Sequence, residues 1–518
     1  MTSMNVIERD PVAHGTTHPI TSVAEHAVFL LYPFQCRKRD WPVTPTATLG
    51  SLAGAGWLPA VGECLRETET RPLWLRKNWP VGDLYHKASQ QLGAGDEPDG
   101  VWTLDSQRHV QQWLSGPSGS TLVLQLPLSV AAQGRLQRCD LQPTDALSIT
   151  FGSVRLVPFR TGQGLLIVEI HLAGGQELPA PLLVEAITAL CHDRGLRWRL
   201  KDGKEVSTRA GNPTFRLAEQ LTDLIGDVAA EPLQGRRLFS YTYAAFDQRL
   251  ADTERQMLLA RLARKFTDDY RLADPRAGLH EVRVFDTVTH AASVEGCVTL
   301  VERIPAEGAK ELPSFLSTFR SEALERRYLP IAAINLHARE ALLALTHSSG
   351  FWPNMAQPAT KDVERLHRLR EDILAFRLGC RLSRVSPIGM HNAFHEALGN
   401  AFGLEPLLAD VNQDALEIGA YLEERAASIA ANAAQRNARP WRWIPRLVSA
   451  ALVVITLVTF GKLLLEALHF DHTEWARWVL LVVSSAAGLV TFWKGDLDAH
   501  TAKHAAGDNV LHQNLGGH

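Results

Sequence analysis

Several short runs in the first three hundred residues alternate apolar with polar positions or gather branched and aromatic residues. Such runs are typical of β-strands, and apolar residues spaced three and four apart are typical of helices. The predicted elements are strands at Ala27–Pro33, Thr121–Leu128, Leu238–Tyr243 and Val282–Thr289, a hairpin over Leu147–Leu172 with RTGQG as its turn, and helices at Pro181–Leu190 and Phe215–Ile225. We therefore expect an α+β domain with a mixed sheet over residues 1–305.

From about Leu312 onward, apolar residues recur at helical spacing over a long stretch. The sequences HSSGFWPNMAQP and SRVSPIGM interrupt this pattern. We expect one long helix, a second at Lys361–Leu382, and a shorter third that ends at Leu398. Pro406 then fits the first turn of a further helix, where its missing N–H is tolerated. Residues 312–440 are thus predicted to form long helices and a stalk.

The predicted stalk carries apolar positions at alternating steps of three and four, which is the seam of a coiled coil. The seam positions are Leu408, Val411, Ala415, Ile418, Leu422, Arg425 and Ile429. A seam requires partner helices. They could be the preceding helices of the same chain or the same helix in neighbouring subunits, and the sequence leaves both open.

Two apolar segments near the C-terminus are long enough to cross a membrane. Leu447–Leu468 is interrupted by Lys462 and Glu466 only, and Trp475–Trp493 has a similar length. At 1.5 Å per residue each covers a hydrocarbon core of about 30 Å. The short link HFDHTE predicts an antiparallel transmembrane hairpin. We therefore expect a multi-pass membrane protein with two C-terminal spans.

Charged residues around these segments predict their orientation. Four arginines precede the first segment, whereas the link contains Asp471 and Glu474 and no Lys or Arg. Since basic residues concentrate on the cytoplasmic side, both termini are predicted to be cytoplasmic, including a tail over residues 494–518. The arginines are Arg436, Arg439, Arg442 and Arg446.

Composition adds few constraints. A net charge of -3 gives no basic field, so we expect no nucleic-acid partner. The six cysteines form no CxxC pair, which argues against a disulfide framework or a thiolate zinc site and fits a reducing cytoplasm. The N-terminus lacks an apolar stretch of signal-peptide length. No phosphate loop, nucleophile elbow or kinase signature is present, so we predict no enzyme, no catalytic residue and no cofactor-binding residue.

Four polar residues fall near one stripe of the first apolar segment and are candidate pore-lining residues: Ser449, Thr456, Thr459 and Glu466. Hydroxyl groups in a ring could replace the water around an ion, and a carboxylate ring could attract cations. The alternative is that the hydroxyls bond to their own backbone, while Lys462 and Glu466 form an ion pair.

His391 and His395 are candidate metal ligands. They are four residues apart on a predicted helix, with Glu396 beside them, so two imidazoles could share a divalent ion. The alternative is an ordinary packed or solvated start of a helix. The sequence HEALG lacks the second histidine of HExxH, which argues against a metalloprotease.

The order of these parts resembles the superfamily of CorA-type divalent-cation channels. The most suggestive stretches are RRYLPIAAINLHAREALLAL, DILAFRLGCRLSRVSPIGMHNAFHEALG and LLADVNQDALEIGAYLEE. The signature Gly-Met-Asn triplet of that family is missing, because the corresponding place reads EALHFDHTEW. The resemblance implies a homopentamer in a bacterial inner membrane, with a divalent cation as the transported or regulatory ion.

These observations predict a CorA-like ion channel or transporter that is gated by its cytoplasmic domain. Two alternatives remain. The first is a signalling or defence effector that perturbs the membrane when its N-terminal domain binds a small molecule. The second is a membrane-tethered scaffold that conducts nothing. The expected partners are the lipid bilayer, further copies of the chain, and a small-molecule or ionic regulator.

Overall fold

The computed structural model divides the chain into two compact units, residues 1–418 and 419–518. The residues that the structure describes are 21–37, 45, 74–92, 101–104, 120–125, 133, 146–173, 178–192, 196–200, 205–206, 217–226, 228–233, 238–267, 270, 272–305, 311–349, 360–441, 444–467, 477–479, 481–483 and 485.

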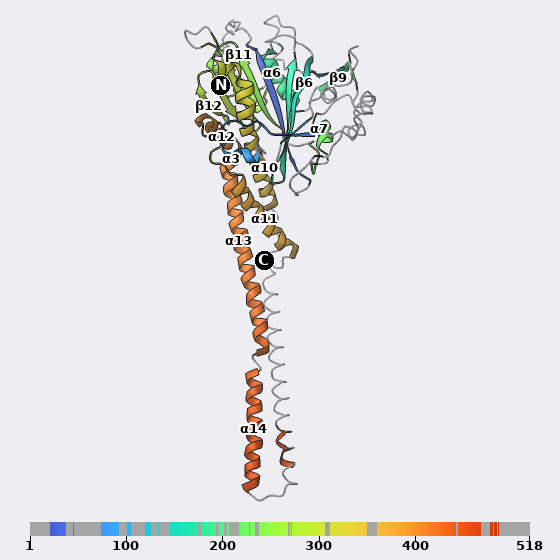
Figure 1. Ribbon diagram of the computed structural model, residues 1–518, viewed down its shortest axis with the longest axis vertical. Helices are drawn as coiled ribbons and strands as arrows, with labels where there is room; N and C mark the ends of the chain where they lie inside the picture. Colours follow the sequence, from blue (N-terminus) through green and yellow to red (C-terminus); the bar gives the residue numbers. More distant parts are fainter. Residues whose placement is uncertain are drawn as a thin grey trace, which may run out of the picture. The chain divides into compact units, whose positions relative to one another are not determined.

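The first unit contains a mixed sheet of twelve described strands and a small two-stranded sheet of β1 and β8 (Figure 1). The strands are β1 Ser22–Val23, β2 Glu25–Gln35, β3 Trp74–Lys77, β4 Val101–Leu104, β5 Ser120–Gln125, β6 Ala146–Pro158, β7 Gln163–Ala173, β8 Leu178–Pro179, β9 Leu196–Leu200, β10 Glu205–Val206, β11 Phe239–Phe246, β12 His280–Phe285, β13 Val288–Ala292 and β14 Gly296–Glu302.

The main path of the large sheet runs in the order β10-β9-β5-β6-β7-β2-β11-β14-β13-β12, with β4 pairing to β6 and β3 to β4. All described pairs are antiparallel except β11 with β14. A parallel neighbour requires a crossover. Helix α8 (Asp252–Arg264) lies in this connection and packs against β14.

Strands β6 and β7 form the predicted hairpin, in register from Pro158 opposite Gly164 to Ser148 opposite Ala173. The turn closes where the Gly162 N–H donates to the Phe159 carbonyl at 3.0 Å. Gly162 has a φ of +79°, a conformation that side chains with a Cβ rarely adopt. The glycine in RTGQG is thus what allows this turn.

The described helices also differ in length and type. Their bounds are α3 His86–Gln91, α6 Ala180–Cys191, α7 Leu217–Ile225, α8 Asp252–Arg264, α9 Ser314–Ser317, the π-helix η1 Phe319–Tyr328, α10 Leu329–Ser349, α11 Thr360–Gly379, α12 Gly389–Phe402, α13 Leu404–Trp441 and α14 Ile444–Ala467. Helix α13 crosses the division between the units at Ile418.

Both faces of the central strands are buried, so each face carries its own layer of helices. On β2, Val28 and Leu30 point into a core shared with α6, α7 and α8. The alternate residues Phe29 and Leu31 point into a second core shared with η1, α10 and α12. A third, smaller core joins α10, α11 and the start of α13.

Most of the predicted elements of the first part are present, but two predictions differ from the structure. The single strand expected at Val282–Thr289 is the two strands β12 and β13, which turn between Phe285 and Val288. The long helix expected from Leu312 consists of α9, η1 and α10. Helix α13 begins at Leu404, two residues before Pro406, directly after Gly403 ends α12 in the left-handed conformation.

An ion-pair network joins η1 to the sheet. Glu169 on β7 is 5% exposed, and its carboxylate accepts hydrogen bonds from Arg320 at 2.7 Å and from the hydroxyl and N–H groups of Ser153 at 2.8 and 3.0 Å. The guanidinium group of Arg320 also pairs with Glu25 at 3.5 Å and with Glu325 at 3.8 Å. A Cβ added to Gly152 would lie 2.6 Å from the Glu169 carboxylate, so this space is fully used.

Burial opposes the ionisation of Glu169. The hydrogen bonds from His171, Ser153 and Arg320 outweigh burial and hold the pKa of this carboxyl well below its usual range. The π-helical winding explains part of the geometry, because residues five apart are hydrogen-bonded neighbours in it. Arg320 and Glu325 therefore reach the same part of the sheet. The Glu325 carbonyl also accepts a hydrogen bond from Trp79 Nε1 at 3.1 Å.

The predicted pair of C-terminal transmembrane helices is wrong: in the part of the chain that the structure describes, no helix is long and apolar enough to cross a membrane. Such a helix needs about 20 consecutive apolar residues. Helix α14 coincides with the first predicted span and carries Lys462. Of the second, only positions 477–479, 481–483 and 485 are described, and each of them is helical.

Three further predictions depended on these spans and are corrected with them. They are the CorA-like fold with two transmembrane helices, the multi-pass location in a bacterial inner membrane with cytoplasmic termini, and the transmembrane channel for metal ions. The residues of the predicted external link and of the tail at 494–518 lie outside the described residues.

Replacing Arg320 with methionine should lower the free energy of unfolding at pH 7 by about 3 kcal/mol, because Glu169 then remains buried without its cation. This loss of stability should shrink as the pH falls below 4.5, the ordinary pKa of a glutamate carboxyl. The hydrogen bonds that lower the pKa of Glu169 stabilise only its ionised form. Urea unfolding at several pH values measures both effects. The control Arg368→Met removes an exposed pair with Glu364 and should change stability by less than about 0.5 kcal/mol.

Candidate functional site

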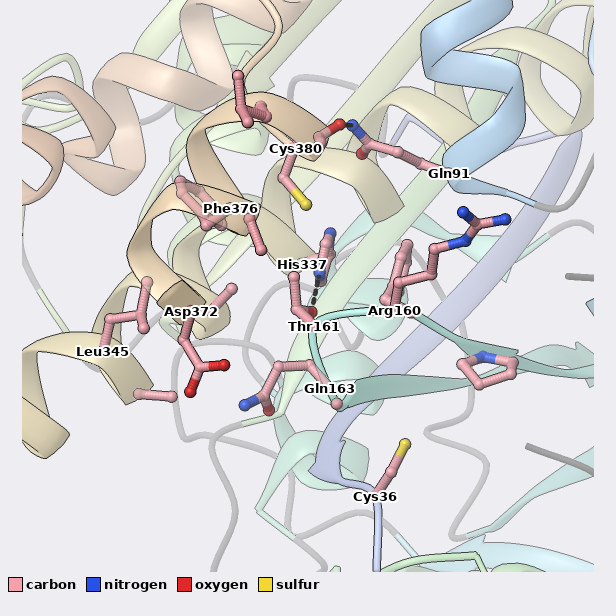
Figure 2. Close-up of a pocket in the computed structure, with 18 of the residues that line it drawn as sticks. Cys36, Gln91, Arg160, Thr161, Gln163, His337, Leu345, Asp372, Phe376 and Cys380 are labelled. Atoms are coloured by element: carbon pink, nitrogen blue, oxygen red, sulfur yellow. Dashed lines mark hydrogen bonds between the residues drawn. The ribbon is translucent and has the colours of Figure 1, made fainter. Parts of the chain in front are cut away.

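A cavity of about 700 Å³ lies in the first unit, between the β6–β7 turn and the helices α10 and α11. The C-terminal end of β2 and helix α3 complete its wall. Figure 2 shows Thr161 and Gln163 from the turn, His337 and Leu345 from α10, and Asp372 and Phe376 from α11 around one space. This volume lies within the range of pockets that bind small organic molecules. We call it the α10–α11 pocket.

The lining mixes apolar surface with hydrogen-bonding groups. The apolar residues include Phe159, Ala341, Ala344, Leu345, Ala375, Phe376 and Leu378, and the polar residues include Gln35, Lys87, Gln90, Gln91, Arg160, Thr161, Gln163, His337, Ser348 and Asp372. Pockets of this kind gain affinity from the apolar surface and orientation from a few polar groups. Four glutamine side chains make this wall rich in uncharged donors and acceptors.

His337 is the most constrained polar side chain of the pocket. It is 1% exposed, it stacks on Phe159 with ring centroids 3.7 Å apart, and its Nε2 is 2.7 Å from the Thr161 hydroxyl. Burial lowers the pKa of His337 to about 3. The ring is therefore neutral at physiological pH, and it offers one donor and one acceptor rather than a positive charge.

Helix α3 is tied to the end of α11 by two hydrogen bonds across the pocket wall. Gln91 Nε2 donates to the Gly379 carbonyl at 2.9 Å, and Lys87 Nζ donates to the Arg381 carbonyl at 3.0 Å. The last carbonyls of a helix have no partner within the helix. Gln91 supplies such a partner to the last residue of α11, and Lys87 bonds two residues beyond it, so both hold the end of α11 beside α3.

The two cysteines of the pocket are poor nucleophiles. Burial raises the pKa of Cys36 and of Cys380 to about 12, so both thiols stay protonated at physiological pH. Figure 2 shows them at different ends of the cavity. The arrangement supports binding of a molecule more directly than it supports covalent chemistry.

The candidate metal ligands His391 and His395 lie on α12, away from this pocket, and they bond to different groups. His391 Nδ1 is 2.9 Å from the Ser386 hydroxyl, whereas His395 lies 2.8 Å from Asn335 Nδ2 and 3.0 Å from the Leu382 carbonyl. Burial lowers the pKa of His391 to about 4 and also lowers that of His395. Among the described residues, no three His, Cys, Asp or Glu side chains are placed to hold a metal ion. The metal site stays a prediction.

The candidate pore residues lie on α14, in the second unit. Thr456 donates its hydroxyl hydrogen bond to the Leu452 carbonyl at 2.7 Å, and Thr459 donates to the Ile455 carbonyl. These are the backbone bonds of the alternative interpretation. Ser449 also lies on α14 and has a polar interaction, and the side chain of Glu466 lies outside the described residues.

No family model, no curated protein and no solved structure matches the chain. The resemblance to CorA-type channels therefore stays a prediction, and the function is inferred from the geometry of the pocket.

Sequence reasoning did not find the α10–α11 pocket, because its wall comes from five segments between Gln35 and Cys380. One signal was available: the RTGQG turn places three polar residues at the tip of a hairpin whose strands are apolar. Polar residues at such a tip are a feature of binding loops on rigid strands. The helices that enclose this hairpin tip, α3, α10 and α11, are brought there by tertiary packing, which the local sequence pattern does not show.

Replacing His337 with phenylalanine should change how stability depends on pH. The pKa of His337 is about 3 in the folded state, so below the ordinary value of 6.5 the unfolded chain takes up a proton that the folded chain does not. The stability that depends on neutral His337 is thus complete above pH 6.5 and is lost as the pH falls. The mean slope between pH 6.5 and 5 should become shallower by about 1.1 kcal/mol per pH unit in His337→Phe.

Urea unfolding at pH 5.0, 5.5, 6.0 and 6.5 measures this slope. The control Leu343→Phe, on the same helix, adds an aromatic ring at a half-exposed position outside the pocket and should keep the slope of the wild type. Equal slopes in wild type and His337→Phe would show that His337 is protonated in the folded protein.

Proposed function

We propose that this protein is a small-molecule sensor, in which the α10–α11 pocket binds the ligand and helix α13 transmits the binding. The observation that carries the proposal is that the pocket and the core around the start of α13 share residues. Ala341 and Phe376 line the pocket, and the same two residues belong to the core that holds the start of α13. A ligand in the pocket therefore changes the environment of residues on which the position of α13 depends.

The packing of α13 shows how direct this connection is. Leu408 and Val411, in its first two turns, are 6% and 1% exposed and pack with Leu342, Leu369 and Ile373 from α10 and α11. Closely packed cores shift between discrete arrangements rather than deforming smoothly. In Figure 1, α11 lies beside the C-terminal half of α10, next to the start of α13. A ligand that favours one spacing of α10 and α11 thus favours one arrangement of α13.

Helix α13 provides a continuous path for the response. It runs without a break from Leu404 to Trp441, past the division at Ile418, so a change at its first turns enters the second unit along the backbone. A ligand shifts the equilibrium between two arrangements of α13 only by the difference between its affinities for them. The pocket supplies that difference if its shape depends on the spacing of α10 and α11.

This proposal retains one part of the earlier hypotheses, the binding of a small-molecule regulator by the first unit. The membrane effector and the membrane-tethered scaffold stay predictions. A homo-oligomer, a pentamer and a regulatory divalent cation stay predictions, as does the absence of enzymatic activity. The packing of the seam residues Leu408, Val411 and Ala415 supports partners from the same chain for the first part of the seam.

A bulky residue inside the pocket should abolish ligand binding while leaving the fold intact. Ala344 lines the cavity and is half-buried, so Ala344→Phe places a ring in the space that a ligand needs. A thermal-shift screen of uncharged polar fragments against the full-length wild type should yield ligands that raise the melting temperature. At a hundred times its dissociation constant, a ligand adds about 2.7 kcal/mol. These shifts should disappear in Ala344→Phe.

The matched control is Leu343→Phe, which changes the neighbouring position on α10 outside the pocket and should keep the shifts. The proposal is contradicted if no fragment stabilises the wild type, or if the stabilising fragments act equally on Ala344→Phe.

A further inference from the structure

Two polar atoms in residues of the α10–α11 pocket have no hydrogen-bond partner among the described residues. They are Gln91 Oε1 and His337 Nδ1, and both are closed to solvent. An unpaired polar atom that is buried is unfavourable, and buried atoms of this kind are rare enough to require an explanation. A pocket whose wall holds two of them is suited to a ligand that supplies the partners.

The orientation of Gln91 is fixed by its other atom. Its Nε2 donates to the Gly379 carbonyl, and since a carbonyl oxygen can only accept, Oε1 is the atom that faces away from this bond. Figure 2 shows Gln91 at the same end of the cavity as Cys380, with His337 between this end and Thr161. Gln91 is half-buried, so a small movement of its side chain admits a donor to Oε1. The matching group on a ligand is an N–H or O–H.

His337 is held by the stack on Phe159 and by Thr161, which leaves Nδ1 as the ring atom without a partner. We assign the tautomer in which the Thr161 hydroxyl donates to Nε2, so that the neutral ring carries its proton on Nδ1. Nδ1 is then a donor, and the matching group on a ligand is a carbonyl oxygen. Together the two atoms match a ligand with one donor and one acceptor.

The charged residues of the pocket already interact with other groups of the chain. Lys87 donates to the Arg381 carbonyl, and both Arg160 and Asp372 have polar interactions of their own. A charged ligand would have to compete for these groups. The unmet hydrogen-bonding capacity is therefore that of the two uncharged side chains.

We propose that the α10–α11 pocket binds an uncharged ligand with a carboxamide or lactam group, whose N–H donates to Gln91 Oε1 and whose carbonyl accepts from His337 Nδ1. This inference rests on the proposed sensor function and adds the chemical class of the ligand. Carboxylates lack the N–H donor, and tertiary amides lack it as well. The selectivity of the pocket thus depends on the acceptor of Gln91.

Three matched probes test the inference with the full-length protein: benzamide, N,N-dimethylbenzamide and benzoate. They share the ring and differ in the donor and the charge. Ligand-observed NMR titrations should show benzamide binding about tenfold more tightly than either of the others, since one good hydrogen bond is lost in each case. In Gln91→Met, which keeps the length of the side chain without its acceptor, the preference over N,N-dimethylbenzamide should fall below about twofold.

Gln90→Met is the control, because Gln90 lines the same pocket and has no unpaired buried atom among the described residues. It should keep the tenfold preference. Equal binding of the three probes to the wild type, or an unchanged preference in Gln91→Met, would overturn the inference while the sensor function stands. Binding of benzamide that Ala344→Phe does not reduce would place the site elsewhere and would overturn both.

Discussion

Burial of both faces of the central strands is the constraint on which the first unit depends. Strands β2 and β11 bury nearly every residue, in contrast to a strand with one face in water. Two layers of helices are required, and the chain supplies α6, α7 and α8 for one face and η1, α10 and α12 for the other. Helix α10 is 21 residues long, and only its first half contributes to the core on the sheet. Its second half packs with α11, and the pocket lies between that pair and the β6–β7 turn.

Polar contacts then fix how the helices sit on this sheet. The Glu169–Arg320 pair holds η1, the Phe159–His337 stack holds the middle of α10, and Gln91 holds the end of α11. Each contact joins a residue of the first half of the first unit to a residue of the second half. Directional contacts of this kind, of which the Glu169–Arg320 pair and the Phe159–His337 stack are at least partly buried, select one arrangement among several apolar ones of similar energy. Helices α10 and α11 also line the pocket, so these contacts define the arrangement of its wall before a ligand binds.

Local patterns predicted the elements near the turn well and the long-range arrangement poorly. The hairpin, β2 and α6 follow from alternation, a Gly-containing turn and helical spacing, all of which act over a few residues. Helix α8 was missed because its charged residues obscure its apolar stripe. The pairing of β11 with β14 and the π-helical winding of η1 depend on residues far apart in the sequence. The transmembrane hairpin was wrong because apolar composition was taken as a span, whereas the described residues contain no helix that meets the requirement.

We propose that the α10–α11 pocket and the start of α13 respond to a ligand as one unit. Hydrogen-exchange mass spectrometry of the full-length protein tests it directly, with and without saturating benzamide or another ligand whose binding Ala344→Phe abolishes. Transmission through α13 predicts changed protection at residues 404–418 together with residues 337–348 and 372–380. A change confined to the pocket segments, with residues 404–418 unaffected, would contradict the transmission through α13.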